Sequence, residues 1–178
     1  MAKVPRWEPA YCEFFAARQH SFLRTAYAML GSWSAAEDAT QQTFVALYAR
    51  WPRISPDKVD AYSRRVLVNT CFAVYRQRGR EVLVDQVPEL GAPEEHDERL
   101  ALLGALDGLD AGDRAVLALR FLEDLPVAEV AQILDLPEGT VKSRTSRALA
   151  RLQTALNPTR KEPTSLTPPS TTAPPSTT

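Results

Sequence analysis

The sequence has few of the residues that build metal centres and disulfide frameworks. Its 178 residues include only two cysteines, two histidines and seven glycines. Cys12 and Cys71 lie far apart, with neither a CxxC spacing nor a neighbouring histidine, so no zinc site and no disulfide framework is expected. Both cysteines are predicted to fill the core. We predict no metal site and no cofactor.

Long apolar runs are missing as well. No stretch reaches the roughly 20 apolar residues that a membrane-spanning helix needs, and the N-terminal segment MAKVPRWEP has no apolar core of a secretion signal. We therefore predict a cytoplasmic protein that does not insert into membranes.

Catalytic constellations are also scarce. His20 and His96 are isolated, no glycine-rich phosphate loop occurs, and no serine or cysteine stands in the context of a catalytic triad. A small enzyme is accordingly the least favoured of the functional classes weighed for this sequence.

The charges that are present are unevenly distributed. The formal net charge is −1, yet residues 1–80 hold 12 Lys and Arg against six Asp and Glu, and residues 81–98 hold seven acidic residues and no Lys or Arg. Segment 81–98 also contains two prolines and little helical periodicity, so we interpret it as a flexible acidic linker. Segment 158–178 is rich in Pro, Thr and Ser and is predicted to be a disordered tail.

The most informative segment is residues 125–156, LPVAEVAQILDLPEGTVKSRTSRALARLQTAL. Apolar residues recur at helical spacing on both sides of the sequence DLP, which predicts a helix-turn-helix. Asp135 stands where such turns usually have glycine, and Asp tolerates a positive φ better than most residues. The first helix is expected to bury Val127, Val130, Ala131 and Leu134, and the second Val141, Thr145, Ala148, Leu149, Leu152 and Ala155.

The second helix of this motif carries a basic stripe with no acidic residue after Glu138. A helix fits the major groove of DNA, where arginine forks onto guanine and where hydroxyls and lysine hold phosphates. A basic stripe alone is about as often a solvated helix face, but the preceding helix and turn favour DNA binding. The predicted DNA-binding residues are Thr140, Lys142, Ser143, Arg144, Arg147 and Arg151.

Residues 8–80 predict a second helical module with three amphipathic helices, at about 9–30, 34–51 and 59–78. Ser34 and Glu37 have the spacing of a capping box at the start of the second helix. The expected buried faces are Tyr11, Phe15, Phe22, Ala26 and Met29 in the first helix, Ala36, Thr40, Thr43, Phe44, Leu47 and Trp51 in the second, and Leu67, Val68, Cys71, Val74 and Tyr75 in the third.

Two exposed faces of this module are candidates for binding. Asp38, Gln41, Gln42 and Val45 share one face, and a valine among short polar residues suits a protein interface, although isolated surface valines are equally common. On the third helix, Arg65, Asn69, Arg76 and Arg80 align, and no acidic residue lies between Arg64 and Arg80. Such a face suits strand-separated DNA, with a solvated face as the competing interpretation.

Three sequence blocks in this order resemble the extracytoplasmic-function (ECF) sigma factors of bacterial RNA polymerase: AEDATQQTFVALYARW, DAYSRRVLVNTCFAVYRQRGR and, after the acidic linker, LPVAEVAQILDLPEGTVKSRTSRALARL. The resemblance covers roughly residues 10–156 and is strongest to the sigma-E-like subgroup common in actinobacteria. It implies an all-α fold of two small helical domains, with a sigma region 2 bundle at 8–80, the acidic linker at 81–98, a region 4 helix-turn-helix at 99–157 and, outside the family pattern, the tail at 158–178.

The resemblance also implies a function without an enzymatic site. Such a factor binds core RNA polymerase, recognises the minus-thirty-five and minus-ten promoter elements and promotes DNA melting. By similarity, Asp38, Gln41, Gln42 and Val45 would dock on the clamp helices of the largest polymerase subunit. The loop 52–56 with Arg64, Arg65, Asn69 and Arg76 would open and read the minus-ten element. From the same resemblance we expect this chain to be a monomer when it is free. An anti-sigma factor is a further expected partner.

The remaining alternative is a conventional helix-turn-helix regulator in which residues 1–80 sense a ligand or dimerise. The basic charge of that half argues against it. A dimeric regulator would bind paired half-sites, whereas a monomer with two DNA-binding modules would bind two dissimilar elements at a fixed separation.

Overall fold

The computed structural model describes residues 5–78, 104–106 and 108–156. The predicted all-α fold is confirmed, and the described ranges contain helices and turns without a strand. The expected linker at 81–98 and tail at 158–178 lie outside these ranges. The helices are α1 (Glu8–Leu30), α2 (Trp33–Arg50), the 3-10 turns η1 (Trp51–Arg53) and η2 (Pro56–Lys58), α3 (Val59–Arg78), α5 (Ala111–Leu117), the π-helical turn η3 (Ala118–Leu122), α6 (Val127–Leu134) and α7 (Glu138–Leu156).

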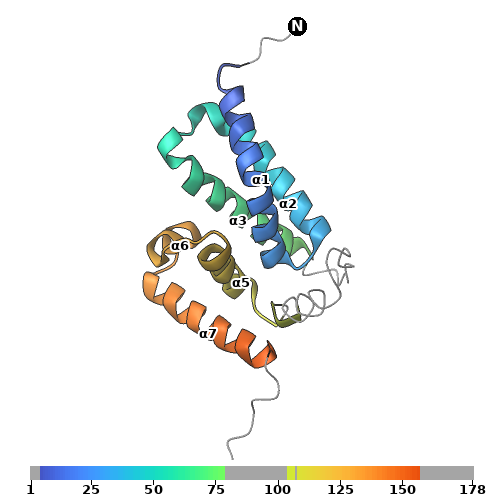
Figure 1. Cartoon of the computed structure of the whole chain (residues 1–178), viewed down its shortest axis with the longest axis vertical. Helices are drawn as coiled ribbons and strands as arrows, with labels where there is room; N and C mark the ends of the chain where they lie inside the picture. The colour runs from blue at the N-terminus through green and yellow to red at the C-terminus, as the bar shows by residue number, and fades with distance from the viewer. Residues whose placement is uncertain (1–4, 79–103, 107, 157–178) are drawn as a thin grey trace, which may run out of the picture.

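Helices α1, α2 and α3 form a three-helix bundle, the upper part of Figure 1. Alanines on the inner face of α2 let α1 and α3 approach closely, while Phe22 of α1 stacks on Phe44 of α2 with ring centroids 5.5 Å apart. The hydroxyl of Tyr11 donates a hydrogen bond to the carbonyl of Phe44 at 2.9 Å. The buried apolar residues of the bundle are Phe22, Ala26, Met29, Ala35, Ala36, Ala39, Phe44, Leu47, Leu67, Val68, Cys71 and Val74.

The predicted capping box at Ser34 and Glu37 is wrong. Gly31 ends α1 in the left-handed conformation, with φ 70°, and this leaves Ser32 extended, with φ −140° and ψ 127°. The extended residue is the N-cap, and the Ser32 hydroxyl accepts a hydrogen bond from the Ala35 amide at 3.3 Å. Ser34 therefore lies in the first turn of α2 instead of capping it.

Several residues expected in the core are exposed. Phe15, Tyr75 and Leu149 keep 36–40 % of their surface accessible, and Ala155 is exposed as well. The reason is that helical periodicity shows which residues share one face of a helix. It does not show how much of that face a neighbouring helix covers. Cys12 is exposed on α1, whereas Cys71 is buried as expected, and burial raises the pKa of its thiol to about 12.

The helix-turn-helix of α6 and α7 follows the predicted turn chemistry. Asp135 adopts the left-handed conformation, with φ 54° and ψ 50°, and its amide donates to the carbonyl of Ala131. Val130, Ala131, Val141 and Ala148 are buried as expected. Ile133 is buried too, which the single-face prediction missed, because α6 packs against α3 as well as α7.

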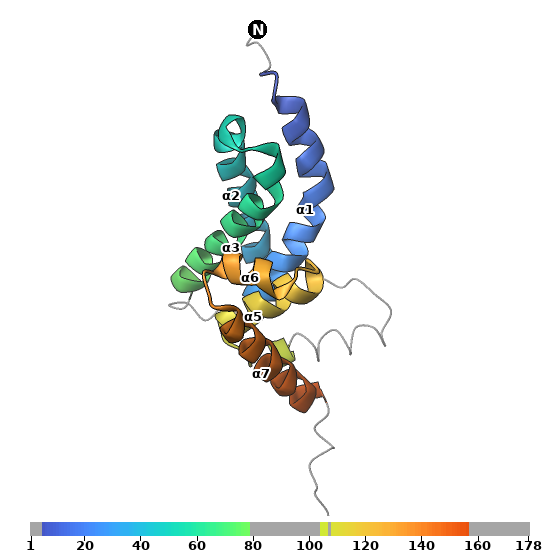
Figure 2. The same ribbon diagram turned by 90° about the vertical axis from the view of Figure 1, so that its left-hand side faces the viewer.

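The two helical domains pack directly against each other. Helix α6 lies beside α3, and α5 and η3 lie against α1, so buried residues of both domains form one continuous cluster. Helix α7 lies at the opposite end of the molecule from the start of α1 (Figures 1 and 2), with α5 and α6 between it and the bundle. None of the helices in the described ranges is both long and apolar enough to span a bilayer.

The positive φ of Asp135 generates a stability prediction. Asp135→Gly should raise the free energy of unfolding by about 0.5–1 kcal/mol, because glycine adopts this conformation without the steric cost of a Cβ. The control Ala150→Gly, at an exposed interior position of α7, should lower it by about 1 kcal/mol. Urea unfolding followed by circular dichroism measures both. A loss of stability in Asp135→Gly would show that the aspartate side chain, and not its backbone conformation, decides the turn.

Candidate nucleic-acid interface

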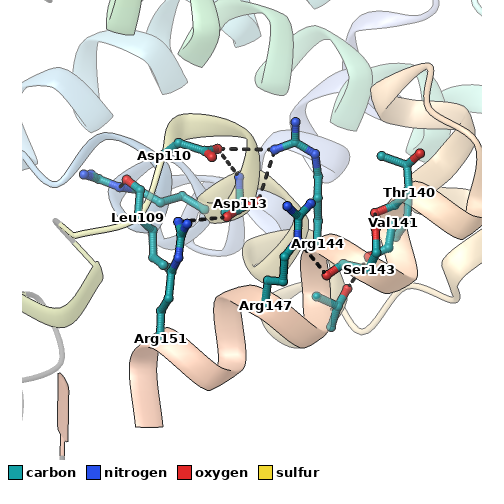
Figure 3. A network of polar contacts seen from close by, with 11 residues as sticks. Leu109, Asp110, Asp113, Thr140, Val141, Ser143, Arg144, Arg147 and Arg151 are labelled. Carbon is teal, nitrogen blue, oxygen red and sulfur yellow. Dashed lines mark hydrogen bonds and ion pairs between the residues drawn. The ribbon is translucent and has the colours of Figure 1, made fainter. Parts of the chain in front are cut away.

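Three of the predicted DNA-binding side chains, those of Arg144, Arg147 and Arg151, lie along one side of α7 (Figure 3). Lys142, Ser143, Arg147 and Arg151 are exposed, while Thr140 and Arg144 are partly buried. The hydroxyl of Ser143 donates to the carbonyl of Thr140 at 3.0 Å, and Nε of Arg147 donates to the carbonyl of Ser143 at 3.3 Å. These contacts stay within one turn of α7 and leave the Arg147 side chain exposed.

Two arginines of the stripe bind aspartates of α5, as Figure 3 shows. Nη1 of Arg144 lies 3.1 Å from Asp113 Oδ1 and 3.3 Å from Asp110 Oδ1, and Nη1 of Arg151 lies 3.6 Å from Asp113 Oδ2. The side chain of Asp113 is only 5 % exposed. Asp110 is also the N-cap of α5 and accepts a hydrogen bond from the Asp113 amide at 2.8 Å.

These ion pairs divide the basic stripe into two parts. A buried carboxylate needs a cationic partner. Arg144 therefore stabilises the fold by pairing with Asp113, which Arg147 and Lys142 do not. The sequence could not reveal this, because the aspartates precede Arg144 by more than 30 residues. Arg144 and Arg151 are thereby oriented by α5, and the exposed Arg147 is the freer of the predicted base-reading groups.

The predicted face of α3 is partly covered. Arg65, Asn69 and Arg76 are exposed residues, but the guanidinium of Arg65 donates to the carbonyl of Gln132 in α6. A cavity of about 430 Å³ separates the two helices here; it is lined by Arg65, Val68, Asn69 and Phe72 of α3 and by Ile133, Leu134 and Asp135. Helix α6 of the helix-turn-helix thus lies against part of the α3 surface that was predicted to bind separated DNA strands.

Arg64 is placed differently from its neighbours. Its side chain is 12 % exposed, and Nε lies 3.0 Å from Oε2 of Glu123, which follows η3. Of the four residues of α3 predicted to bind DNA, Arg64 is therefore the one that the structure holds in an interdomain ion pair. Arg80, which was expected on the same face, lies outside the described residues.

The loop 52–56, which was expected to act on the minus-ten element, forms part of a basic hollow beside α3; the other lining residues, Arg50, Lys58 and Tyr62, were not predicted from the sequence. The loop between α2 and α3 and the adjoining helix ends enclose about 660 Å³ lined by Arg50, Arg53, Ile54, Ser55, Lys58 and Tyr62. Nη1 of Arg50 lies 3.2 Å from the Tyr62 hydroxyl. A hydrogen bond from Ser55 lowers the pKa of the neighbouring Asp57 carboxyl below its ordinary value. The sequence signal for this hollow was the presence of three cationic residues within nine positions, Arg50, Arg53 and Lys58, followed by the aromatic Tyr62.

Two of the four α2 residues predicted to bind protein, Gln41 and Val45, line an apolar groove. Asp38, Gln41, Gln42 and Val45 are all exposed, with Val45 at 64 %. The groove encloses about 580 Å³ between α1 and α2, and its exposed surface is mainly apolar. Its lining residues include Tyr11, Phe15, Leu23, Phe44, Val45 and Tyr48. Phe15 is exposed here, although helical periodicity assigned it to the core. Tyr48, which is exposed as well, was not singled out from the sequence.

Comparison with known proteins matches both domains to one family. Residues 14–81 match the family description "Sigma-70 region 2", and residues 105–154 match "Sigma-70, region 4". The chain is 37 % identical over 149 residues to the RNA polymerase sigma-E factor of Streptomyces coelicolor, which covers 81 % of this chain and 84 % of that protein. It is 33 % identical over 165 residues to the ECF sigma factor SigE of Mycolicibacterium smegmatis, over 85 % of this chain and 62 % of that protein.

Solved structures show the same arrangement of helices. The sigma factor RpoE in complex with the anti-sigma factor NepR from Bartonella quintana superposes with a TM-score of 0.73 at 25 % identity, over 85 % of this chain and 99 % of that chain. CnrH, solved in complex with the cytosolic domain of CnrY, shares the fold with a TM-score of 0.68 at 23 % identity, over 85 % and 90 % of the two chains. With both regions matched in order and at this level of identity, the chain belongs to the ECF branch of the sigma-70 family of RNA polymerase sigma factors.

Proposed function

We propose that this chain binds core RNA polymerase with the α1–α2 face and reads a promoter with two separate surfaces. Helix α7 reads the minus-thirty-five element as duplex, and α3 with the basic hollow reads the minus-ten element as a separated strand. The observation that carries the proposal is the presence of both sigma regions in one chain, each with an exposed basic surface.

The two surfaces suit different forms of DNA. Helix α7 lies at one end of the molecule, where a straight duplex can approach it, and Lys142, Ser143 and Arg147 offer phosphate and base contacts. The hollow of Arg50, Arg53 and Lys58 with Tyr62 offers cations for a backbone and a ring for a base, which is the chemistry of single-strand binding. Asn69 supplies an amide for a base edge on the adjoining helix.

The apolar groove between α1 and α2 supports the proposed polymerase contact. Val45 and Tyr48 are large exposed apolar side chains beside Gln41, and such a patch with a polar rim is typical of a protein interface. The proposed docking residues are Asp38, Gln41, Gln42 and Val45, with the aromatic residues of the groove extending the surface toward α1.

The proposal includes the setting in which the chain works. RpoE of Bartonella quintana is solved with its anti-sigma factor, and by similarity we include an anti-sigma factor among the partners of this chain. We further propose a cytoplasmic monomer that carries no catalytic group of its own and acts through the polymerase. The domain boundaries that go with this function are 8–80 for region 2 and 99–157 for region 4, joined by 81–98 and followed by the tail at 158–178.

The direct test of this function is reconstitution with core polymerase. The purified chain is mixed with bacterial core RNA polymerase and genomic DNA of the source organism, and the 5′ ends of the transcripts are sequenced against core polymerase alone. Discrete start sites that share two upstream elements are expected. Absence of core binding together with footprints on paired half-sites would instead identify a conventional helix-turn-helix regulator.

Arg147→Ala and Arg144→Ala should separate DNA reading from structure. Arg147→Ala should cost about 1–3 kcal/mol of discrimination at one position of the minus-thirty-five element and change the free energy of unfolding by less than about 0.5 kcal/mol. Arg144→Ala should lower the free energy of unfolding by about 1–3 kcal/mol, because it removes a partner of the buried Asp113 carboxylate. Binding assays on single-base promoter variants and urea unfolding measure the two effects. Equal stability losses in both variants would contradict the division of the stripe.

Asn69→Ala should slow promoter opening without weakening binding to core polymerase. Removing the amide takes away a partner for an unstacked base, and extruding a base costs a few kcal/mol that the protein must offset. Opening is measured by permanganate reactivity of unpaired thymines on a duplex promoter, with a premelted template as the control. If premelting restored none of the lost transcription, Asn69 would not act in melting.

A further inference from the structure

Two acidic residues of α5 lie beside the helix proposed to read duplex DNA. Asp110 is the N-cap of α5 and Asp113 lies in its first turn. Both contact arginines of α7 that follow them by more than 30 residues. Figure 3 shows the side chains of Arg144 and Arg151 directed toward these aspartates. The first turn of α5 therefore places negative charge next to the basic stripe.

The contacts engage both carboxylate oxygens of Asp113. Oδ1 lies 3.1 Å from Nη1 of Arg144, and Oδ2 lies 3.6 Å from Nη1 of Arg151. Nη1 of Arg144 also lies 3.3 Å from Oδ1 of Asp110. Two carboxylates thus face two guanidinium groups, so this cluster of four side chains carries no net formal charge.

The chain leaves room for the cluster at Gly112. A Cβ at this position would lie 2.6 Å from Nη1 of Arg144, which is closer than Cβ atoms come to other atoms in real structures. Glycine within a helix is unfavourable relative to alanine. The missing side chain at Gly112 therefore lets the Arg144 guanidinium lie against the first turn of α5.

The cluster opposes phosphate binding on this side of α7. Phosphate contacts supply nearly all of the sequence-independent affinity of a protein for duplex DNA. The Asp110 side chain is 61 % exposed, so its charge repels phosphates that approach this side. Capping does not require that charge, because Asn and Ser cap a helix as well as Asp does. Arg151 is 58 % exposed, yet its guanidinium faces Asp113.

We propose that Asp110 and Asp113 neutralise the α5 side of α7, so that Arg144 and Arg151 do not bind DNA phosphates and the sequence-independent affinity of the chain for duplex DNA stays low. This inference rests on the duplex-reading role proposed for α7. Arbitrary duplex is in large excess over promoters in any genome, and a chain that binds it weakly stays available to the polymerase. Duplex binding by α7 then depends on Lys142, Ser143 and Arg147.

The test measures binding of the full chain to a short duplex of arbitrary sequence over a series of salt concentrations, by fluorescence anisotropy. Asp113→Asn removes the charge and keeps an oxygen that can accept from Arg144. Asp110→Asn removes the charge and keeps an N-cap. Glu129→Gln, at an exposed position of α6 outside the cluster, removes one acidic charge and is the matched control. Circular dichroism measures helix content, and Asp110→Asn decides the question even where Asp113→Asn lowers it.

The expected result is a stronger and more salt-dependent interaction. Asp113→Asn should bind the arbitrary duplex about tenfold more tightly at low salt, and its log–log salt slope should steepen by up to roughly 0.9 for each arginine that gains a phosphate. Asp110→Asn should change in the same direction by less, because Arg144 keeps one carboxylate. Glu129→Gln should keep the wild-type slope. A variant that had only lost structure would bind more weakly.

A second comparison assigns the effect to Arg151. In the otherwise unchanged chain, Arg151→Ala should alter the affinity for the arbitrary duplex by less than about twofold, because Asp113 already neutralises the guanidinium. In the Asp113→Asn background the same substitution should remove most of the gained affinity. This double-mutant cycle isolates the coupling between the two residues.

Two results would overturn the inference. If both aspartate variants kept the wild-type affinity and slope while Arg147→Ala weakened duplex binding, α7 would read DNA without this control and the proposed function would stand. If Arg151→Ala weakened binding equally in the unchanged chain and in the Asp113→Asn background, Arg151 would already hold a phosphate.

The same proteins separate this inference from the proposed function. Transcription by core polymerase with the wild-type chain tests the function independently of the salt series. Tighter duplex binding by the aspartate variants, together with no discrete start sites from the wild-type chain, would reject the sigma function. The acidic pair would then limit the DNA binding of a conventional regulator.

Discussion

The burial of the Glu123 carboxylate between the two helical domains is the interaction on which the form of this molecule depends. It brings Thr25 and Arg64 to one point and, with α6, closes the bundle of α1–α3 onto the helix-turn-helix. A second buried carboxylate, Asp113, acts within region 4 by holding Arg144. In both places an arginine that looks like a DNA contact in the sequence satisfies a buried acid, because an unpaired charge in the interior is costly.

These two carboxylates divide the basic residues by availability. Lys142 and Arg147 remain exposed on α7, at the end of the molecule, where the proposed duplex contact is accessible. Arg64 and Arg65 are engaged between the domains, whereas Asn69 and Arg76 of the proposed single-strand surface are exposed.

Much of the fold could be predicted because each long helix has a clear amphipathic face. The ends and contacts could not. The N-cap is Ser32, because the cap depends on where α1 stops, and Leu149 is exposed, because no periodicity tells which part of α7 has a neighbour. Asp135 was predictable from local turn chemistry. The partners of Arg64 and Arg144 were not, because their acids are tens of residues away in sequence. Local physics fixed the elements, and long-range charge pairing decided which candidate residues are free.

The central claim is that the two helical domains pack directly against each other in the free chain. Spin labels at Ala61→Cys of α3 and Ala128→Cys of α6, both exposed positions, report this distance directly by pulsed electron paramagnetic resonance. Cys12 is replaced by serine, and the buried Cys71 thiol, with its pKa raised to about 12, should escape labelling. The account predicts one narrow, short distance in the free chain. A broad or long distance in the free chain would contradict it.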